Sequence, residues 1–206
     1  MIGATPELSP AQEAIPVREK LLNAAVGVFC QKGYDGGRIE EIVTLSGVNV
    51  RMVYHYFGSK EGLYDESIRH VCGKVMTAVG TPEADAADPF EAIEIAYKRY
   101  CTICLEQPLY AKLLTWEGPN GWSSVTRVFK EEETIGSLFC RLVRSAKEAG
   151  CIEPDLIVEM AAVQLASFPH VLCLSPAVPD YQALQNVPNE ELVEASWKMA
   201  KRSLKV

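Results

Sequence analysis

Apolar residues recur at intervals of three and four along most of this chain. The period is clearest over residues 17–33, 89–106 and 124–149, where polar residues fill the intervening positions. Such spacing gathers apolar side chains on one face of a helix, whereas a half-buried strand alternates at every second position. The sequence contains no convincing strand pattern and no internal repeat. The pattern therefore predicts an all-α fold of about nine helices.

Glycines and capping residues divide the N-terminal part of the helical pattern into separate helices. The first helix should end at Gly33, because glycine suits a helix C-terminus. Two short helices are then expected over 38–45 and 50–56, and Asn49 is a good N-cap for the second. A longer helix should follow over 60–79.

Prolines and glycines also delimit the later helices. These helices are predicted over 89–106, 108–116, 124–149, 154–168 and 190–204. The chain should bend or leave the helix near Pro169, because proline lacks a backbone donor. A proline-bearing loop is expected between that point and the last helix.

Residues 1–16 carry no apolar period and are rich in proline and alanine, which predicts a flexible arm. They lack the basic start and the apolar run of a signal peptide. No window approaches about 18 consecutive apolar residues, so no membrane-spanning segment is expected. These features predict a cytoplasmic protein with no membrane partner.

Seven cysteines are scattered through the helical patterns, and this odd number favours reduced, buried thiols. Cys101 and Cys104 form a C-x-x-C pair, but no second pair of cysteines or histidines completes a metal site. Neither a metal nor another cofactor is predicted. A thiol-based redox sensor that uses Cys101 and Cys104 stays open as an alternative, although positions i and i+3 on a helix suit a disulfide poorly.

The net charge of −7 argues against a nucleic-acid partner, but the charge is unevenly distributed. Residues 17–70 hold seven basic and seven acidic residues, and no acidic residue occurs from Ile42 to Lys60. Aromatic and basic residues crowd together in the stretch VNVRMVYHYFGSKEGLY, residues 48–64. A ligand meets the local field rather than the total charge, so this stretch is a candidate nucleic-acid surface.

Two short helices joined by a glycine-containing turn, after a longer helix, are typical of a helix-turn-helix. Five apolar residues can close a small core beneath the turn: Ile42, Leu45, Val48, Val53 and Phe57. Arg51, Tyr54 and His55 then share the outward face of the second helix. A recognition helix requires this arrangement, because its donors must reach phosphates and base edges in the major groove. Lys60 begins the next helix, where backbone amides can also bind phosphate.

The sequence from Lys20 to Ile68 resembles the DNA-binding domain of TetR-family transcriptional repressors. The resemblance rests on a helix ending in F-x-x-K-G-Y, a turn I-x-x-x-x-G-V and a tail V-Y-H-Y-F-G-S-K-E-G-L. It covers roughly residues 17–70 and implies a helix-turn-helix DNA-binding domain there. For residues 71–206 it implies a helical domain that binds an effector and forms a homodimer.

The resemblance also implies roles for individual residues. Tyr54 matches a tyrosine that meets a phosphate, His55 matches a frequent DNA contact, and Lys60 matches a lysine on the phosphate backbone. The full set of expected DNA contacts is Arg38, Asn49, Val50, Arg51, Tyr54, His55 and Lys60.

The chain departs from the family pattern at two places. Members often carry Lys or Arg where this chain has Val50, and a small residue where it has Arg51, as if the basic side chain had moved by one position. A hydroxyl residue often opens the second helix, where this chain has Gly37 and Arg38. The acidic residues at 40–41 are unfavourable near DNA, so modest or unusually salt-sensitive affinity is expected.

For the second domain the resemblance implies a small-molecule cavity between helices. Aromatic residues with few charges suit an apolar cavity, although any one of them is more often an ordinary core residue. The candidate lining residues are Tyr97, Tyr100, Cys104, Trp116, Phe129 and Phe168. A small apolar or aromatic effector is expected.

The helices at 154–168 and 190–204 are the expected homodimer interface. Their alanines allow close packing, and Trp197 is a plausible anchor because tryptophan concentrates binding energy. A two-fold dimer places two recognition helices about one DNA turn apart, or a multiple of it, which predicts a pseudo-palindromic operator in double-stranded DNA.

An enzyme is not predicted, because the sequence contains no nucleophile–base pairing, phosphate-binding loop or metal set. No catalytic residue is therefore assigned. The function expected from the sequence is a ligand-responsive, sequence-specific DNA-binding regulator, a repressor that its effector releases from DNA.

Overall fold

A computed structural model of the chain describes residues 15–129 and 134–204. The arm predicted at 1–16 lies almost wholly outside these described residues. The part of the chain that the structure describes contains α-helices and 3₁₀-helices and no strand, which confirms the all-α prediction.

Eleven α-helices are present in the described ranges, where about nine were expected. They are α1 (Val17–Gly36), α2 (Ile39–Ser46), α3 (Val50–Phe57), α4 (Lys60–Val79), α5 (Pro82–Asp85), α6 (Pro89–Glu106), α7 (Pro108–Thr115), α8 (Ser123–Val128), α9 (Ile135–Glu148), α10 (Val158–Leu174) and α11 (Asn189–Leu204). Two 3₁₀-helices, η1 (Ser175–Ala177) and η2 (Pro179–Asn186), fill the segment expected to be a proline-bearing loop.

The extra helices arise from α5 and from a break in the helix predicted over 124–149. α8 ends at Val128, and α9 begins with its own capping box, in which Thr134 and Ser137 bond each other's backbone N–H. A capping box satisfies N–H groups that have no partner in the first turn, so it marks a new helix start. The continuous helix expected from periodicity alone was wrong for this reason.

Two other helix ends also differ from expectation. α10 begins at Val158 rather than at Pro154, because the preceding segment is held by a backbone bond from Glu153 N to Leu204 O, 3.3 Å long. The helix also continues through the buried Pro169 to Leu174. By contrast, α1 breaks helical geometry at Gly33, where φ is 66°, at the residue expected to end it.

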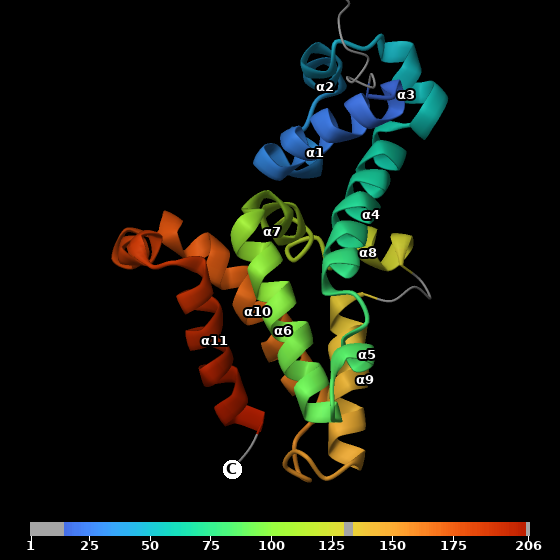
Figure 1. Cartoon of the computed structure of the whole chain (residues 1–206). Helices are drawn as coiled ribbons and strands as arrows, with labels where there is room; N and C mark the ends of the chain where they lie inside the picture. The colour runs from blue at the N-terminus through green and yellow to red at the C-terminus, as the bar shows by residue number, and fades with distance from the viewer. Residues whose placement is uncertain (1–14, 130–133, 205–206) are drawn as a thin grey trace, which may run out of the picture.

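The helices form two groups joined by α4 (Figure 1). α1, α2 and α3 pack together at one end of the molecule, and α6, α9, α10 and α11 form a bundle at the other. Each group has its own apolar core, and α4 belongs to both: Ile68 is buried in the first and Val79 in the second. Leu113 of α7 is buried in the first core, so α7 is a second connection.

The junction between α3 and α4 is built from three small residues. Gly58 ends α3 with φ 74°, and the hydroxyl of Ser59 accepts from the backbone N–H of Gly62 at 3.0 Å. A β-carbon at Gly62 would lie 2.1 Å from the carbonyl oxygen of Phe57. A side chain at position 62 would require the Phe57 backbone to shift, so this junction requires glycine there.

Substitution by alanine at two glycines of α4 should therefore change the free energy of unfolding in opposite directions. Gly62→Ala should lower the free energy of unfolding by roughly 1–3 kcal/mol, because the backbone must shift. Gly73→Ala should raise it by about 0.5–1 kcal/mol, because the glycine is exposed in a helix and has open space around it. Urea unfolding followed by circular dichroism measures both. Equal effects of the two substitutions would contradict this account of the junction.

Candidate DNA-binding face and effector cavity

The helix-turn-helix geometry follows from local sequence signals. Gly47 ends α2 in the left-handed region at φ 65°, which non-glycine residues adopt at a cost. The Asn49 side chain then accepts from the backbone N–H of Arg51 at 2.9 Å and starts α3. Ile42, Val53 and Phe57 are buried beneath the turn. Leu45 was expected among them, but it is 66% exposed and lies outside this core.

The outward face of α3 presents several of the expected contact residues together. Arg51, Tyr54 and His55 are exposed, and so is Val50 at the start of the helix. Tyr56 is also exposed and lies edge-on to His55 with ring centroids 4.9 Å apart. The face therefore offers cationic, hydroxyl and aromatic groups on one short helix.

Lys60 is engaged within the protein. Its Nζ lies 4.6 Å from the centroid of the Tyr34 ring and donates to the carbonyl oxygen of Asp35 at 3.4 Å. Both contacts are to the segment before α2, so Lys60 ties the start of α4 to that segment. An N–O distance of 3.4 Å is long for a hydrogen bond, so this contact holds the ammonium only weakly.

The segment before α2 explains one departure from the family pattern. A β-carbon at Gly37 would lie 2.5 Å from the Phe29 ring, so a capping residue with a side chain cannot occupy that position. Arg38 takes the N-cap position without a side-chain bond and is exposed. Glu41, one of the two acidic residues there, pairs with Lys32 at 2.7 Å.

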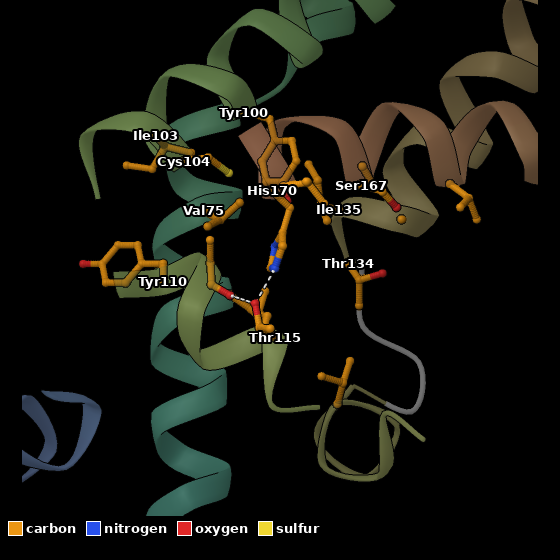
Figure 2. A pocket seen from close by; sticks show the side chains of 18 of the residues that line it. Val75, Tyr100, Ile103, Cys104, Tyr110, Thr115, Thr134, Ile135, Ser167 and His170 are labelled. Carbon is orange, nitrogen blue, oxygen red and sulfur yellow. Dashed lines mark hydrogen bonds between the residues drawn. The ribbon is translucent and has the colours of Figure 1, made fainter. Parts of the chain in front are cut away.

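A cavity of about 720 Å³ lies in the second group of helices. Its walls come from α4, α6, α7, α9 and α10 together with the segment around α8, and most of its lining is aliphatic, aromatic or sulfur-containing. Figure 2 shows Tyr100, Ile103, Cys104 and His170 bordering it. A cavity of this size and polarity is suited to a small apolar ligand.

Two of the six residues expected to line this cavity do so, Tyr100 and Cys104. The other four lie elsewhere. Tyr97 is fully buried against Trp197 with ring centroids 5.4 Å apart, Phe129 lies near Arg69 in the first core, and Phe168 faces outward from α10. Trp116 packs against α1. The helical period predicts that these aromatic residues lie on helices. It does not predict which face of a helix borders the cavity, because that depends on how neighbouring helices pack.

The cavity wall contains a hydrogen-bonded polar pair that sequence reasoning missed. His170 Nε2 of α10 lies 3.0 Å from Thr115 Oγ1 of α7, and this hydroxyl also donates to the carbonyl oxygen of Ala111 at 2.9 Å (Figure 2). Burial lowers the pKa of His170, which keeps its imidazole neutral at physiological pH. The two residues are far apart in the sequence, and no spacing rule joins them.

Three consecutive residues at the end of α7, Thr115 and the two that follow it, connect the cavity to α1 and α4. Thr115 bonds His170 at the cavity wall. Trp116 donates from Nε1 to the carbonyl oxygen of Cys30 at 3.3 Å, and its ring lies against Gly33. Glu117 is only 1% exposed, and it accepts from the Tyr64 hydroxyl of α4 at 2.9 Å.

The second carboxylate oxygen of Glu117 accepts from the backbone N–H groups of Ser124 and Val125, at 2.9 and 3.3 Å. A buried carboxylate is tolerated only when it is bonded in this way. The bond to Glu117 and burial together raise the pKa of Tyr64, so its hydroxyl remains a donor.

The thiols of the proposed redox pair have different surroundings. Cys101 is fully buried with its Sγ 3.6 Å from Ser196 Oγ of α11, whereas Cys104 faces the cavity. Burial raises the pKa of both thiols, which keeps them protonated and poorly nucleophilic. Among the described residues, no group of three or more metal-ligating side chains could hold an ion.

Comparisons with known proteins agree with this geometry. Residues 21–66 match the model for bacterial regulatory proteins of the tetR family. The chain is 31% identical over 161 residues to the HTH-type transcriptional repressor NicS of Pseudomonas putida, covering 76% of each protein. This chain belongs to the TetR family. It is a helix-turn-helix, DNA-binding transcriptional regulator.

Solved structures share this fold over most of the chain. The fatty acid degradation regulator FadR of Bacillus halodurans has a TM-score of 0.72 and 18% identity, with 92% of this chain and 96% of that one covered. FadR of Bacillus subtilis, solved in complex with stearoyl-CoA, also has a TM-score of 0.72, with 15% identity and coverage of 88% and 96%. At these identities the likeness concerns the fold.

Removing the Glu117 charge should destabilise this regulator more than removing one of its partners. Glu117→Gln should lower the free energy of unfolding by about 2–4 kcal/mol, because a neutral amide oxygen bonds the two backbone N–H groups less strongly than a carboxylate does, and the amide NH2 cannot accept from the Tyr64 hydroxyl. Tyr64→Phe should lower it by about 1 kcal/mol, because it removes one bond of three. Chemical denaturation measures both, and a Glu117→Gln protein as stable as the wild type would refute the role given to this carboxylate.

Proposed function

We propose that the protein is a ligand-responsive repressor, which binds a pseudo-palindromic operator as a homodimer and is released by a small apolar effector. The observation that carries this proposal is one helix, α3, that combines a buried apolar side with the exposed donors Arg51, Tyr54 and His55. The likeness to the repressor NicS supports it. We assign DNA binding to residues 17–70 and effector binding and dimerisation to 71–206, with the inferred DNA contacts as expected from the sequence.

The outward face of α10 supports the homodimer. Met160 is 67% exposed, Phe168 is 37% exposed, and Ile157, the N-cap residue of this helix, is also exposed. Val163 and Val171 are exposed as well, but they border the cavity. Monomeric proteins rarely leave a large apolar patch uncovered. A second copy related by two-fold symmetry would cover it, because each α10 would then present the same face to the other.

The anchor expected for this interface, Trp197, is not available. It is 3% exposed and packs against Phe90 and Tyr97 inside the protomer. The small residues Ala161, Ala162 and Ala200 are likewise buried within the protomer. We therefore assign the dimer contact to the aliphatic and methionine side chains on the outer side of α10.

The same helix is apolar enough to be considered as a membrane span. Residues 158–177 have a mean hydropathy of 1.3, and they are the one such stretch in the described residues; 22% of the window is buried. The inner face of α10 packs on α6, α7, α9 and α11, as a helix of a globular bundle does. A partner protomer accounts for the outer face without a membrane, which accords with a cytoplasmic location.

The cavity supports a small-molecule effector. The likeness in fold to FadR of B. subtilis, which was solved in complex with stearoyl-CoA, supports this proposal. The largely aliphatic and aromatic lining here suits a molecule with a large apolar part. We assign Tyr100 and Cys104 to the lining and withdraw Tyr97, Trp116, Phe129 and Phe168 from it.

The effector can act on DNA binding through the segment 115–117. A ligand that moves His170 also moves Thr115, and the next two residues hold α1 and α4 directly. The expected result is a change in the separation of the two recognition helices, driven by the different affinities of the ligand for the two geometries. Structures of DNA-bound and effector-bound forms with identical contacts at 115–117 would refute this route.

The first test is a selection of bound duplexes from a random DNA library at near-physiological salt. We expect an enriched pseudo-palindrome whose half-sites lie about one helical turn apart, or a multiple of that. A protein that keeps its helical circular dichroism spectrum but enriches no sequence would contradict the proposed function.

Two substitutions should affect DNA binding differently. Arg51→Ala should weaken binding to the selected operator by about 1–3 kcal/mol and relax its specificity, because a base contact is lost. Lys60→Ala should weaken binding to all sequences and reduce the salt slope by about 1, because a phosphate contact is lost. Fluorescence anisotropy over a salt series measures both. Arg202→Ala, on the exposed surface of α11, is the control, and identical behaviour of all three would overturn the placement of the recognition helix.

A charge on the outer face of α10 should dissociate the dimer. Met160→Glu should raise the dimer dissociation constant by about two orders of magnitude, because symmetry buries the new charge twice. Light scattering during size-exclusion chromatography measures the mass. Leu109→Glu, at an exposed apolar position of α7, should leave the dimer intact. A Met160→Glu protein that stays dimeric would place the interface elsewhere.

A further inference from the structure

The polar pair in the cavity wall defines a specific hydrogen-bonding requirement for the effector. His170 extends from α10 toward Thr115 on α7, and both residues line the cavity (Figure 2). The surrounding lining is largely apolar, with Val75, Ile103 and Leu174 among its members. A polar group in such a setting discriminates between ligands, because a ligand that leaves a donor or acceptor unmatched gives up hydrogen bonds to water without replacing them.

The positions of the protons follow from the donor inventory. A threonine hydroxyl has one proton, and Thr115 donates it to the carbonyl oxygen of Ala111 at 2.9 Å. The contact of 3.0 Å between Thr115 Oγ1 and His170 Nε2 can then be a hydrogen bond only if Nε2 carries a proton and donates it. A neutral imidazole has one N–H, so Nδ1 of His170 carries a lone pair and is an acceptor.

This acceptor has no partner within the described part of the protein. The His170 ring contacts one hydrogen-bonding group, the Thr115 hydroxyl. Among the described residues, the one buried side-chain nitrogen or oxygen without a hydrogen-bond partner is Tyr97 Oη, so Nδ1 of His170 is not a buried atom. Nδ1 is therefore accessible rather than enclosed, and the cavity is the space that the ring lines.

The described part of the cavity wall offers no counter-charge to an anionic ligand, because no Lys, Arg, Asp or Glu is among its described lining residues. Burial holds the His170 ring in its neutral form. A carboxylate would lose its hydration without gaining a cation from these described residues, and it would place a negative charge against the Nδ1 lone pair.

We propose that the effector is an uncharged, largely apolar molecule with one hydroxyl or N–H group, which donates its proton to Nδ1 of His170. This inference rests on the proposed function, because it assigns the chemistry of the same cavity. Thr115 acts as a positioning residue: it accepts the Nε2 proton and so holds the tautomer in which Nδ1 can accept. Ethers and carboxylates of the same shape are rejected, because neither presents a donor.

Three matched probes test this requirement on the full-length protein. They are para-phenylphenol, its methyl ether and para-phenylbenzoate, which share one rigid apolar body and differ in a single group. Isothermal titration calorimetry should show that the phenol binds about tenfold or more tightly than the ether, and that the benzoate is the weakest. Equal affinities for phenol and ether, or tightest binding of the benzoate, would overturn the proposal without any substitution.

Variants locate the preference on His170. His170→Phe keeps an aromatic ring but has no acceptor, so the phenol and the ether should bind it with similar affinity. Thr115→Val removes the acceptor that keeps the proton on Nε2 of His170. The ratio of phenol affinity to ether affinity should therefore shrink, while the ether binds this variant more tightly than it binds the wild type. His70→Phe replaces a histidine of α4 outside the cavity and should keep the wild-type ratio. A wild-type ratio in His170→Phe would overturn the assignment.

The outcomes separate this inference from the proposed function. Probes that bind the wild-type protein without discrimination would remove the hydrogen-bond requirement and leave the effector cavity standing. If no probe binds, the cavity is not a small-molecule site of this class, and both the requirement and the effector role of the cavity fail. DNA selection is independent of the probes, so the DNA-binding part of the proposed function is judged separately.

Discussion

The carboxylate of Glu117 lies at the point where the two halves of the molecule depend on each other. It is buried, yet each of its oxygens is bonded: one to the Tyr64 hydroxyl of α4 and the other to two backbone N–H groups at the start of α8. A buried charge persists only where its surroundings keep these bonds, so the positions of α4 and α8 are mutually fixed. Because α4 carries both apolar cores, the orientation of the DNA-binding end relative to the cavity follows from this local arrangement.

Glu117 and the two residues before it each contact a different part of the molecule. Thr115 faces the cavity, Trp116 faces α1, and Glu117 faces α4. A change at the cavity wall therefore needs no long chain of contacts to reach the DNA-binding helices, because adjacent peptide units already contact all three elements. Coupling through a short, well-packed segment requires only that the segment have two arrangements that the two ligands favour differently.

The sequence predicted most accurately those features that depend on local chemistry. The helix-turn-helix could be located because Gly47 and Asn49 act on their immediate neighbours, and the family resemblance rests on the same stretch. The cavity could not be located in this way. His170 and Thr115 come together only when α10 packs against α7, and the sequence treats each as an isolated polar residue. Trp197 failed as an interface residue for a related reason, since helical period gives a face but not the element that the face meets.

Gly33 combines two requirements that come from different parts of the molecule. Its positive φ suits glycine, and its missing side chain makes room for Trp116: a β-carbon at this position would lie 2.9 Å from Cδ2 of that ring. Any side chain at 33 would act as a wedge between the DNA-binding helices and the segment that follows α7. The smallest residue of the protein thus fixes how closely its two halves approach, and a single added methyl group there would force those halves apart.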